Sequence, residues 1–180
     1  LFVGRFDPRG TPLWTRELAP FDISGAALDM ALDGKNLVIA GTNDRRPLQQ
    51  LTVVGLDAAG NHRFSRPLCS GTSVHTSALT IADDQTIYLA GSYGETVECD
   101  GRSLPFEAGS HSAQDAFVLA LDAGGCLRWL EHLSSPANDR INAMSVRGDE
   151  LLLTGESAAT IDIGGRPERL SGGFLLSTKR

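Results

Sequence analysis

The residues that could do chemistry gather in the segment 91–115. It holds the acids Glu95, Glu98, Asp100 and Glu107 and the aromatic residues Tyr93 and Phe106. Two carboxylates roughly 5 to 10 Å apart at the mouth of a cleft cleave glycosidic bonds, and aromatic rings on a variable loop stack on sugars. The segment is therefore the best place for an enzymatic or lectin-like carbohydrate site. The competing interpretation, which the pattern favours, is a solvated loop.

Histidines and turn acids give weaker signals. None of the four histidines (His62, His75, His111 and His132) is paired at metal-ligand spacing, and no G-x-S-x-G nucleophile motif occurs. A Ser-His-Asp triad assembled in space stays open. Calcium loops need several oxygen ligands close together, whereas the turns at Asp7, Asp57 and Asp122 each offer one acid. We therefore predict no catalytic residue, no metal site and no cofactor.

Three cysteines, Cys69, Cys99 and Cys126, stand at irregular spacing without a C-x-x-C pair, which argues against a zinc site. Two interpretations remain. The first, which we favour from the sequence, is that all three are small buried thiols. The second is a single disulfide between Cys69 and Cys99, which would require an exported protein.

The overall composition excludes two classes of partner. The formal net charge is −6 and no stripe of lysine and arginine occurs, which argues against nucleic acid. No apolar run approaches the roughly 18 residues of a transmembrane helix, so no membrane span is predicted.

One short pattern recurs three times with identical internal offsets: an aspartate, a glycine three residues later and an aromatic residue four residues after that. The copies are Asp7, Gly10 and Trp14; Asp57, Gly60 and Phe64; and Asp122, Gly125 and Trp129. Aspartate suits the first position of a type I turn, and glycine suits a position that needs positive φ. Each copy predicts a β-hairpin with a bulge glycine. Because the three aromatic residues are equivalent, we expect them to pack between repeats.

A second half-unit alternates with the first and ends in Gly41, Gly91 or Gly155 after an aliphatic run. A short strand and a turn precede each run. Together the half-units predict an all-β fold of about three four-stranded antiparallel modules, the size of propeller blades. The chain would be a single domain over 1–180, divided roughly into a half blade at 1–26, units at 27–76 and 77–140, and an incomplete unit at 141–180.

The half-units resemble the bacterial β-propeller repeat of SBBP type. The segment from Asp115 to Trp129 is similar to D-A-F-V-x-x-x-D-x-x-G-x-x-x-W, and the segment from Thr86 to Ser92 is similar to N-V-Y-V-x-G-S. The resemblance implies a propeller fold in an exported bacterial protein with an extracellular, periplasmic or cell-surface location. It carries over no catalytic residue.

About three blades do not close a ring, because closed propellers have four to eight. We expect a segment of a longer protein. The alternatives are a homo-oligomer that completes the ring, and a swap in which residues 1–18 complete the blade that begins at Ile141. The functional hypothesis is a non-catalytic structural or interaction module that binds a protein, a surface ligand or the remaining blades of its own chain. The alternative is an enzyme or lectin-like domain with its site at 91–115.

Overall fold

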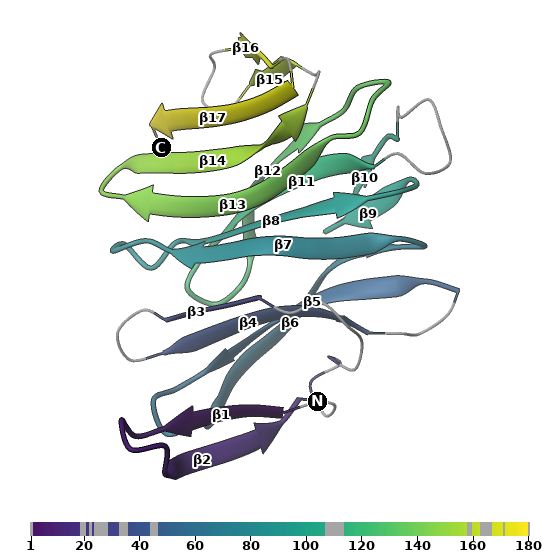
Figure 1. Ribbon diagram of the computed structural model, residues 1–180. Helices are drawn as coiled ribbons and strands as arrows, with labels where there is room; N and C mark the ends of the chain where they lie inside the picture. Colours follow the sequence, from purple (N-terminus) through teal and green to yellow (C-terminus); the bar gives the residue numbers. More distant parts are fainter. Residues whose placement is uncertain are drawn as a thin grey trace.

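The protein was analysed as a computed structural model, in which residues 2–18, 21, 23, 29–32, 36–43, 47–106, 114–157, 160–162, 167–170 and 172–179 are described. These residues form seventeen strands and no α-helix. The strands make five antiparallel sheets that succeed one another along a stack, from the β1–β2 hairpin at one end to β17 and the β15–β16 hairpin at the other (Figure 1). The predicted all-β, antiparallel fold is confirmed.

Two sheets are built from the first part of the chain. The N-terminal hairpin pairs β1 (Phe2–Phe6) with β2 (Pro12–Glu17). The six-stranded sheet has the order β10-β9-β6-β5-β4-β3. Its strands are β3 (Asp29–Leu32), β4 (Leu37–Asn43), β5 (Gln49–Leu56), β6 (His62–Gly71), β9 (Val97–Cys99) and β10 (Arg102–Leu104).

Three further sheets follow. The four-stranded sheet, in the order β12-β11-β8-β7, contains β7 (Val74–Ile81), β8 (Ile87–Tyr93), β11 (Asp115–Leu121) and β12 (Leu127–Leu133). The three-stranded sheet, in the order β13-β14-β17, contains β13 (Arg140–Arg147), β14 (Glu150–Ser157) and β17 (Gly172–Lys179). A small hairpin pairs β15 (Thr160–Asp162) with β16 (Pro167–Arg169).

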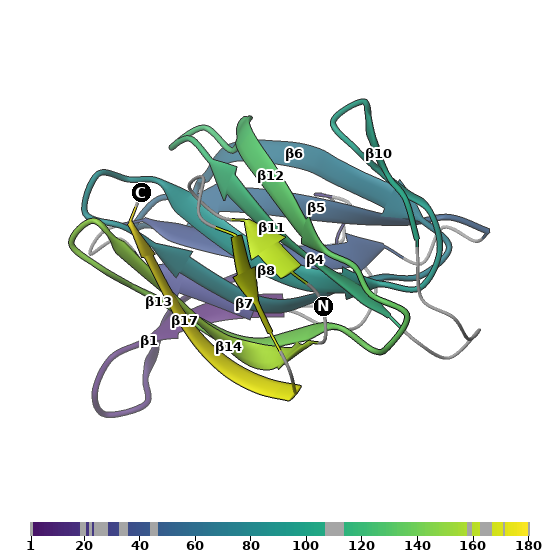
Figure 2. The same cartoon turned by 90° about the horizontal axis from the view of Figure 1, so that it is seen from above.

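The order of strands follows the repeat, with one difference. The first strands of successive sheets, β3, β7 and β13, contact one another across the sheets. The β9–β10 hairpin, however, lies between β8 and β11 in sequence but pairs with β6 of the preceding sheet. It lies at the periphery when the molecule is viewed from above (Figure 2). The β15–β16 hairpin, at the matching place in the next repeat, contacts β12 of its own preceding sheet. Each insertion therefore links two neighbouring sheets.

The Asp-x-x-Gly steps form hairpin loops of one geometry. In the first loop, one carboxylate oxygen of Asp7 accepts the backbone N–H groups of Arg9 and Thr11, each at 2.8 Å. Gly10 has a φ of 83° and donates its N–H to the carbonyl of Asp7 at 2.9 Å. The loops at Asp57 and Asp122 repeat these contacts, and all three hairpins carry a register shift beside the loop. Aspartate and glycine thus have local structural roles.

Two glycines of the second half-unit, Gly91 and Gly155, lie opposite a bulge. Gly91 pairs with Thr76 and Gly155 pairs with Ile141, next to the register shifts of β7 and β13. A Cβ atom at Gly91 would lie 2.1 Å from the carbonyl oxygen of His75, and one at Gly155 would lie 1.9 Å from that of Arg140. Any larger residue would push the two strands apart.

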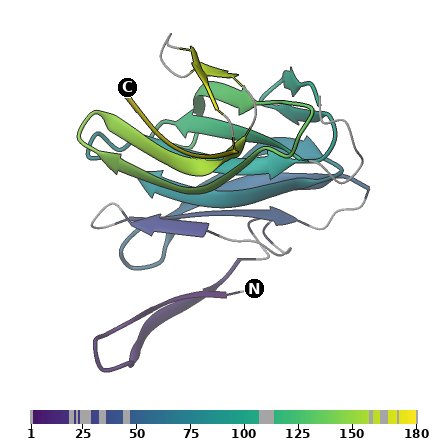
Figure 3. The same cartoon turned by 45° about the horizontal axis from the view of Figure 1, so that its top comes forward.

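The core is continuous through the middle of the stack. The strands β4, β8 and β11 are buried along their whole length, because other strands flank them and neighbouring sheets cover them. The terminal sheets are less covered: β1 buries only Val3. The β1–β2 hairpin stands out at the end of the stack in Figure 3.

Candidate functional site

The segment 91–115 is partly a strand hairpin and not simply a loop. Its residues Val97–Leu104 form β9 and β10 around a tight turn, and residues 107–113, including Glu107 and His111, lie outside the described residues. The pairs Cys69–Cys99 and Ser70–Glu98 join β9 to β6. The hairpin thereby extends the six-stranded sheet at its outer edge.

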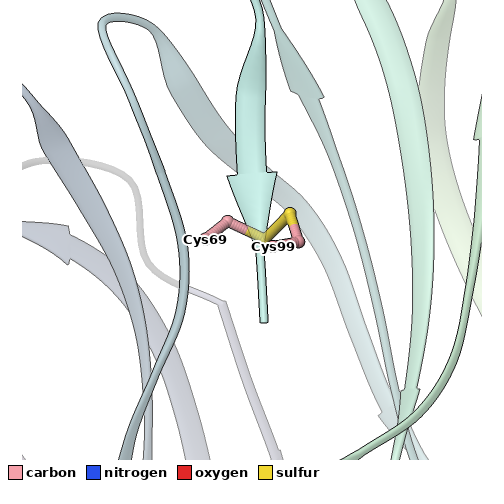
Figure 4. Close-up of a disulfide and its surroundings, with 2 residues drawn as sticks. All are labelled: Cys69 and Cys99. Atoms are coloured by element: carbon pink, nitrogen blue, oxygen red, sulfur yellow. A yellow bond between two sulfur atoms is a disulfide. The ribbon is translucent and has the colours of Figure 1, made fainter. Parts of the chain in front are cut away.

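A disulfide between Cys69 and Cys99 links this hairpin covalently to β6 (Figure 4). The two Cα atoms lie 4.0 Å apart on directly opposed positions of the strand pair, and both residues are buried. The favoured interpretation of three buried thiols is therefore wrong. The bridge requires β9 to pair with a strand of the preceding sheet, which the irregular cysteine spacing does not reveal. Cys126 is free, but it is exposed.

The aromatic candidates of this segment belong to the core. Tyr93 is fully buried, and its hydroxyl donates to the carbonyl oxygen of Pro105 at 2.9 Å. The ring centroids of Phe106 and Phe117 each lie 6.4 Å from that of Tyr93. Phe106 is half-buried against the same cluster. Tyr93 is therefore a packing residue and does not present its ring to a ligand.

The acidic candidates are exposed and are held by separate local contacts. Glu95 accepts a hydrogen bond from the hydroxyl of Thr72. Glu98 faces solvent on β9. Asp100 adopts a positive φ of 48° in the turn of the hairpin, and its N–H donates to the carbonyl of Leu68 at 2.9 Å. None of the five candidates lines the pocket beside the N-terminal hairpin.

The repeat residues form contacts between successive hairpins. Trp14 donates its indole N–H to the carbonyl of Ala58 at 3.0 Å, and its ring covers Gly60, where a Cβ atom would lie 2.7 Å away. Phe64 covers Gly125 in the same manner, also at 2.7 Å. The aromatic residue of one hairpin thus lies on the turn glycine of the next. Trp129 lies 5.9 Å from the ring of Tyr88 in its own sheet and packs against the core cluster that includes Leu151 and Leu153 of the next sheet.

Two arginines that were not predicted from the sequence as contact residues strengthen these contacts. Arg16 donates to the carbonyl of Gly60 at 2.8 Å, and its guanidinium carbon lies 5.9 Å from the centroid of the Trp14 ring. Arg66 donates to the carbonyl of Gly124 at 3.4 Å. Both stand two residues after the repeat aromatic, where the third copy has Glu131, so extending the pattern by two positions would have indicated an arginine in the first two copies.

Electrostatics at the turns follow from the same hydrogen bonds. The pKa of Asp57 is lowered from its ordinary value, first by the backbone N–H of Asn61 and then by the side-chain amide of that residue. The pKa of Asp122 is lowered chiefly by the backbone N–H of Cys126. These bonds favour the charged carboxylate, which identifies both acids as turn-stabilising groups rather than proton donors.

The contact between Trp14 and the turn that begins at Asp57 borders an open apolar pocket. It has a volume of about 180 Å³ and lies between the N-terminal hairpin and the β3–β4 strands. Its walls are formed by Val3, Gly4, Arg5, Trp14, Met30, Leu32, Leu37, Asp57 and Ala58. Large apolar side chains of the same part of the chain are exposed, with Phe2 at 73% and Leu32 at 72%, and Phe6, Leu13 and Met30 are exposed as well. This apolar surface, here called the N-terminal surface, is the candidate binding site.

Over the described ranges, no three His, Cys, Asp or Glu side chains are placed to hold a metal ion. The described residues also contain no helix that is long and apolar enough to cross a bilayer.

Comparison with known proteins leaves the family open. No protein-family model matches the chain, and no curated protein matches it. Among solved structures, a puromycin hydrolase S511A mutant complexed with PGG is similar over 84% of this chain, at 12% sequence identity and a TM-score of 0.29. The match spans 26% of that enzyme's chain.

Proposed function

We propose that the protein is a non-catalytic β-propeller-repeat module of an exported bacterial protein, and that its role is to bind further blades or a protein partner. The contacts among β3, β7 and β13 support a blade-like arrangement, since the first strands of successive blades lie side by side around a propeller axis. The contacts of Trp14 with Gly60 and of Phe64 with Gly125 join successive hairpins, as in repeat architectures whose units contact their neighbours.

The observation that carries the binding role is the N-terminal surface. Among the described strands, β1 pairs only with β2, whereas its counterpart β5 pairs with both β4 and β6. An unpaired strand edge beside exposed apolar side chains favours the addition of another strand. The occupant we propose is a blade strand of the same type as β4, supplied by a second copy of the chain.

The disulfide supports export. Bridges such as Cys69–Cys99 form and persist in oxidising compartments and are rare in the cytosol. An extracellular, periplasmic or cell-surface location is therefore part of the proposal. The alternative of a carbohydrate site at 91–115 has lost one of its two stacking candidates, because Tyr93 is buried, and the other, Phe106, is half-buried against the same cluster.

Light scattering during size-exclusion chromatography tests the binding role. We expect a mass above the 19.1 kDa of one chain, rising with concentration, and a return to one chain in Leu32→Glu. The matched control is Leu48→Glu, an apolar residue that is 50% exposed outside the pocket and should leave the mass unchanged. A monodisperse single chain at all concentrations, unaffected by Leu32→Glu, would contradict strand addition between copies at this surface.

A further inference from the structure

The second Asp-x-x-Gly loop is covered by the hairpin that precedes it in the chain. The ring of Trp14 lies on Gly60, and its indole N–H donates to the carbonyl of Ala58 at 3.0 Å. Two residues after the tryptophan, Arg16 donates to the carbonyl of Ala59 at 3.4 Å. The loop thus binds an aromatic ring and, beside it, one polar side chain.

The third loop is covered in the same manner by the second hairpin. The ring of Phe64 lies on Gly125, and Arg66 donates to the carbonyl of Gly124 at 3.4 Å. Both covered glycines, Gly60 and Gly125, are buried. The chain therefore contains two examples of what this loop binds: an aromatic ring on the glycine and a polar side chain from two residues further on.

The loop of the first hairpin has the same geometry but is open. Gly10 has a φ of 83°, close to the 78° of Gly60 and the 79° of Gly125. It is exposed, and nothing lies within 4 Å of the position of its Cβ atom. Among the hydrogen bonds of the described residues, none ends on the carbonyl oxygen of Pro8, Arg9 or Gly10. The groups that bind side chains in the other two loops are accessible here.

The strand face next to this loop is open as well, at the end of the stack (Figure 3). Phe2 and Phe6 lie on one face of β1 and are 73% and 57% exposed. The repeat places Phe6 at the position of Leu56, which is fully buried in a cluster with Val3 and Leu18 of the first hairpin. In the second repeat, one preceding hairpin thus covers both the loop and the strand face. Both are uncovered in the first repeat, so a single β-hairpin with an aromatic residue fits them together.

Arg9 distinguishes the open loop from the two covered loops, which have Ala59 and Gly124 at this position. Because Arg16 reaches the carbonyl of Ala59, the corresponding side chain of an occupant would lie beside Arg9. An arginine there would be repelled by the like charge, whereas a glutamate would be attracted. The third copy of the repeat has an acid at this place, Glu131, two residues after its aromatic residue.

We propose that the Asp7–Gly10 loop and the adjoining face of the β1–β2 hairpin bind a protein partner that presents the sequence Trp-x-Glu from a β-hairpin. The tryptophan ring covers Gly10, and its indole N–H donates to the carbonyl of Pro8. Tryptophan suits this loop better than phenylalanine, because phenylalanine has no donor. The glutamate of the partner pairs with Arg9. This contact goes beyond the proposed strand addition, which uses the edge of β1 and not the loop.

The test is an NMR titration of the ¹⁵N-labelled chain with N-acetyl-Trp-Leu-Glu amide. We expect saturable shifts of the amide signals of Arg9, Gly10 and Thr11. N-acetyl-Leu-Leu-Glu amide should bind roughly tenfold more weakly, because it lacks the ring and the indole donor. N-acetyl-Trp-Leu-Arg amide should bind about threefold more weakly, because its charge faces Arg9. Equal affinity for the tryptophan and leucine peptides, tighter binding of the arginine peptide, or shifts confined to the pocket residues Met30 and Leu32 would each overturn the proposal.

Variants of the loop locate the site. Gly10→Ala has room in the free chain, but its Cβ atom would meet the partner's ring, as a Cβ atom at Gly60 would lie 2.7 Å from the ring of Trp14. We expect roughly tenfold weaker binding of N-acetyl-Trp-Leu-Glu amide. Gly101→Ala, at a φ of 75° and likewise with nothing within 4 Å, is the matched control and should change nothing.

A charge reversal tests the acidic preference at an exposed position, where the fold is not at risk. In Arg9→Glu the order of the two tryptophan peptides should reverse, so that N-acetyl-Trp-Leu-Arg amide binds more tightly. The amide spectrum of each variant verifies that the chain is folded. Unchanged affinity in Gly10→Ala, or an unreversed preference in Arg9→Glu, would overturn the site.

Failure here is distinguishable from failure of the proposed function. The concentration-dependent mass depends on Leu32 at the edge of the N-terminal surface. A chain that self-associates normally but does not bind N-acetyl-Trp-Leu-Glu amide contradicts only the loop site. A chain that binds this peptide but stays a single chain at all concentrations contradicts only strand addition between copies.

Discussion

The hairpins β1–β2 and β5–β6 carry the same repeat residues and differ sharply in burial. Both have the Asp-x-x-Gly loop, the same side-chain hydrogen bonds and an aromatic residue four positions after the glycine. Yet the last six residues of β5 are buried, whereas β1 buries only Val3. The reason is that β5 lies between β4 and β6 and contacts β7 of the next sheet, while β1 pairs with β2 alone among the described strands. The repeat motif specifies a turn, and the neighbours specify a core.

The aromatic residues make this contrast concrete. Phe64 is buried between its own strand and the turn at Gly125, while Trp14 is half-buried over the turn at Gly60. The same repeat position thus contributes to a closed sheet contact in one hairpin and to an open surface in the other.

Substituting the two aromatics is expected to give the largest difference. Phe64→Ala should lower the free energy of unfolding by about 4 kcal/mol, because it leaves a cavity between two sheets. Trp14→Ala should cost about 1 kcal/mol, since solvent already reaches the ring. Urea unfolding monitored by circular dichroism measures both. Equal losses of unfolding free energy would show that the two hairpins are packed alike, which would contradict the difference in burial described above.

Breaking the disulfide tests whether covalent anchoring contributes to the stability of β5–β6. Replacing Cys69 and Cys99 together by serine should lower the free energy of unfolding by about 3 kcal/mol, given the 30-residue separation. Calorimetry without reductant measures the change, and Cys126→Ser, at the free and exposed cysteine, is the control that should show none. A double variant as stable as the control would mean that strand pairing alone holds β9 in place.

The equivalent turn glycines Gly10 and Gly60 allow the two hairpins to be compared at a single repeat position. Gly10→Ala should cost about 1 kcal/mol, because alanine is strained at a φ of 83° although nothing lies within 4 Å of its Cβ. Gly60→Ala has a similar φ of 78° but also meets the ring of Trp14, so about 2 kcal/mol is expected. Chemical unfolding compares the pair. A loss in Gly10→Ala as large as that in Gly60→Ala would argue against the contact between hairpins.

The smallest expected effect is on pH dependence. The folded-state pKa values of Asp57 and Asp122 are depressed, so their stabilisation is complete above the unfolded-state value of about 3.9. It is lost as the pH falls through the lower folded-state values. The melting temperature should therefore decrease on acidification below about pH 4, and Asp57→Asn should make that decrease shallower. A melting temperature that rises over the same range would contradict the assignment of these acids to the turns.

Part of the fold was predictable from the sequence because its signals are local. An aspartate carboxylate bonds to amides two and four residues ahead, and a glycine adopts positive φ within the same loop. The alternating strands and the hairpins at Asp7, Asp57 and Asp122 follow from such short-range terms. The binding candidates do not follow from local signals: the pattern predicts Tyr93 on a variable loop, whereas the residue ends β8 and is buried by the packing around it.

By itself, the sequence determined the hairpins, their turn residues and the all-β composition of the chain, since these depend on backbone preferences over a few residues. Only the tertiary structure decided the pairing of β9 with β6, the Cys69–Cys99 bridge and the exposure of Leu32. These features join residues far apart in the chain. The free energy of such contacts depends on how the sheets pack against one another, and a local sequence pattern does not contain that information.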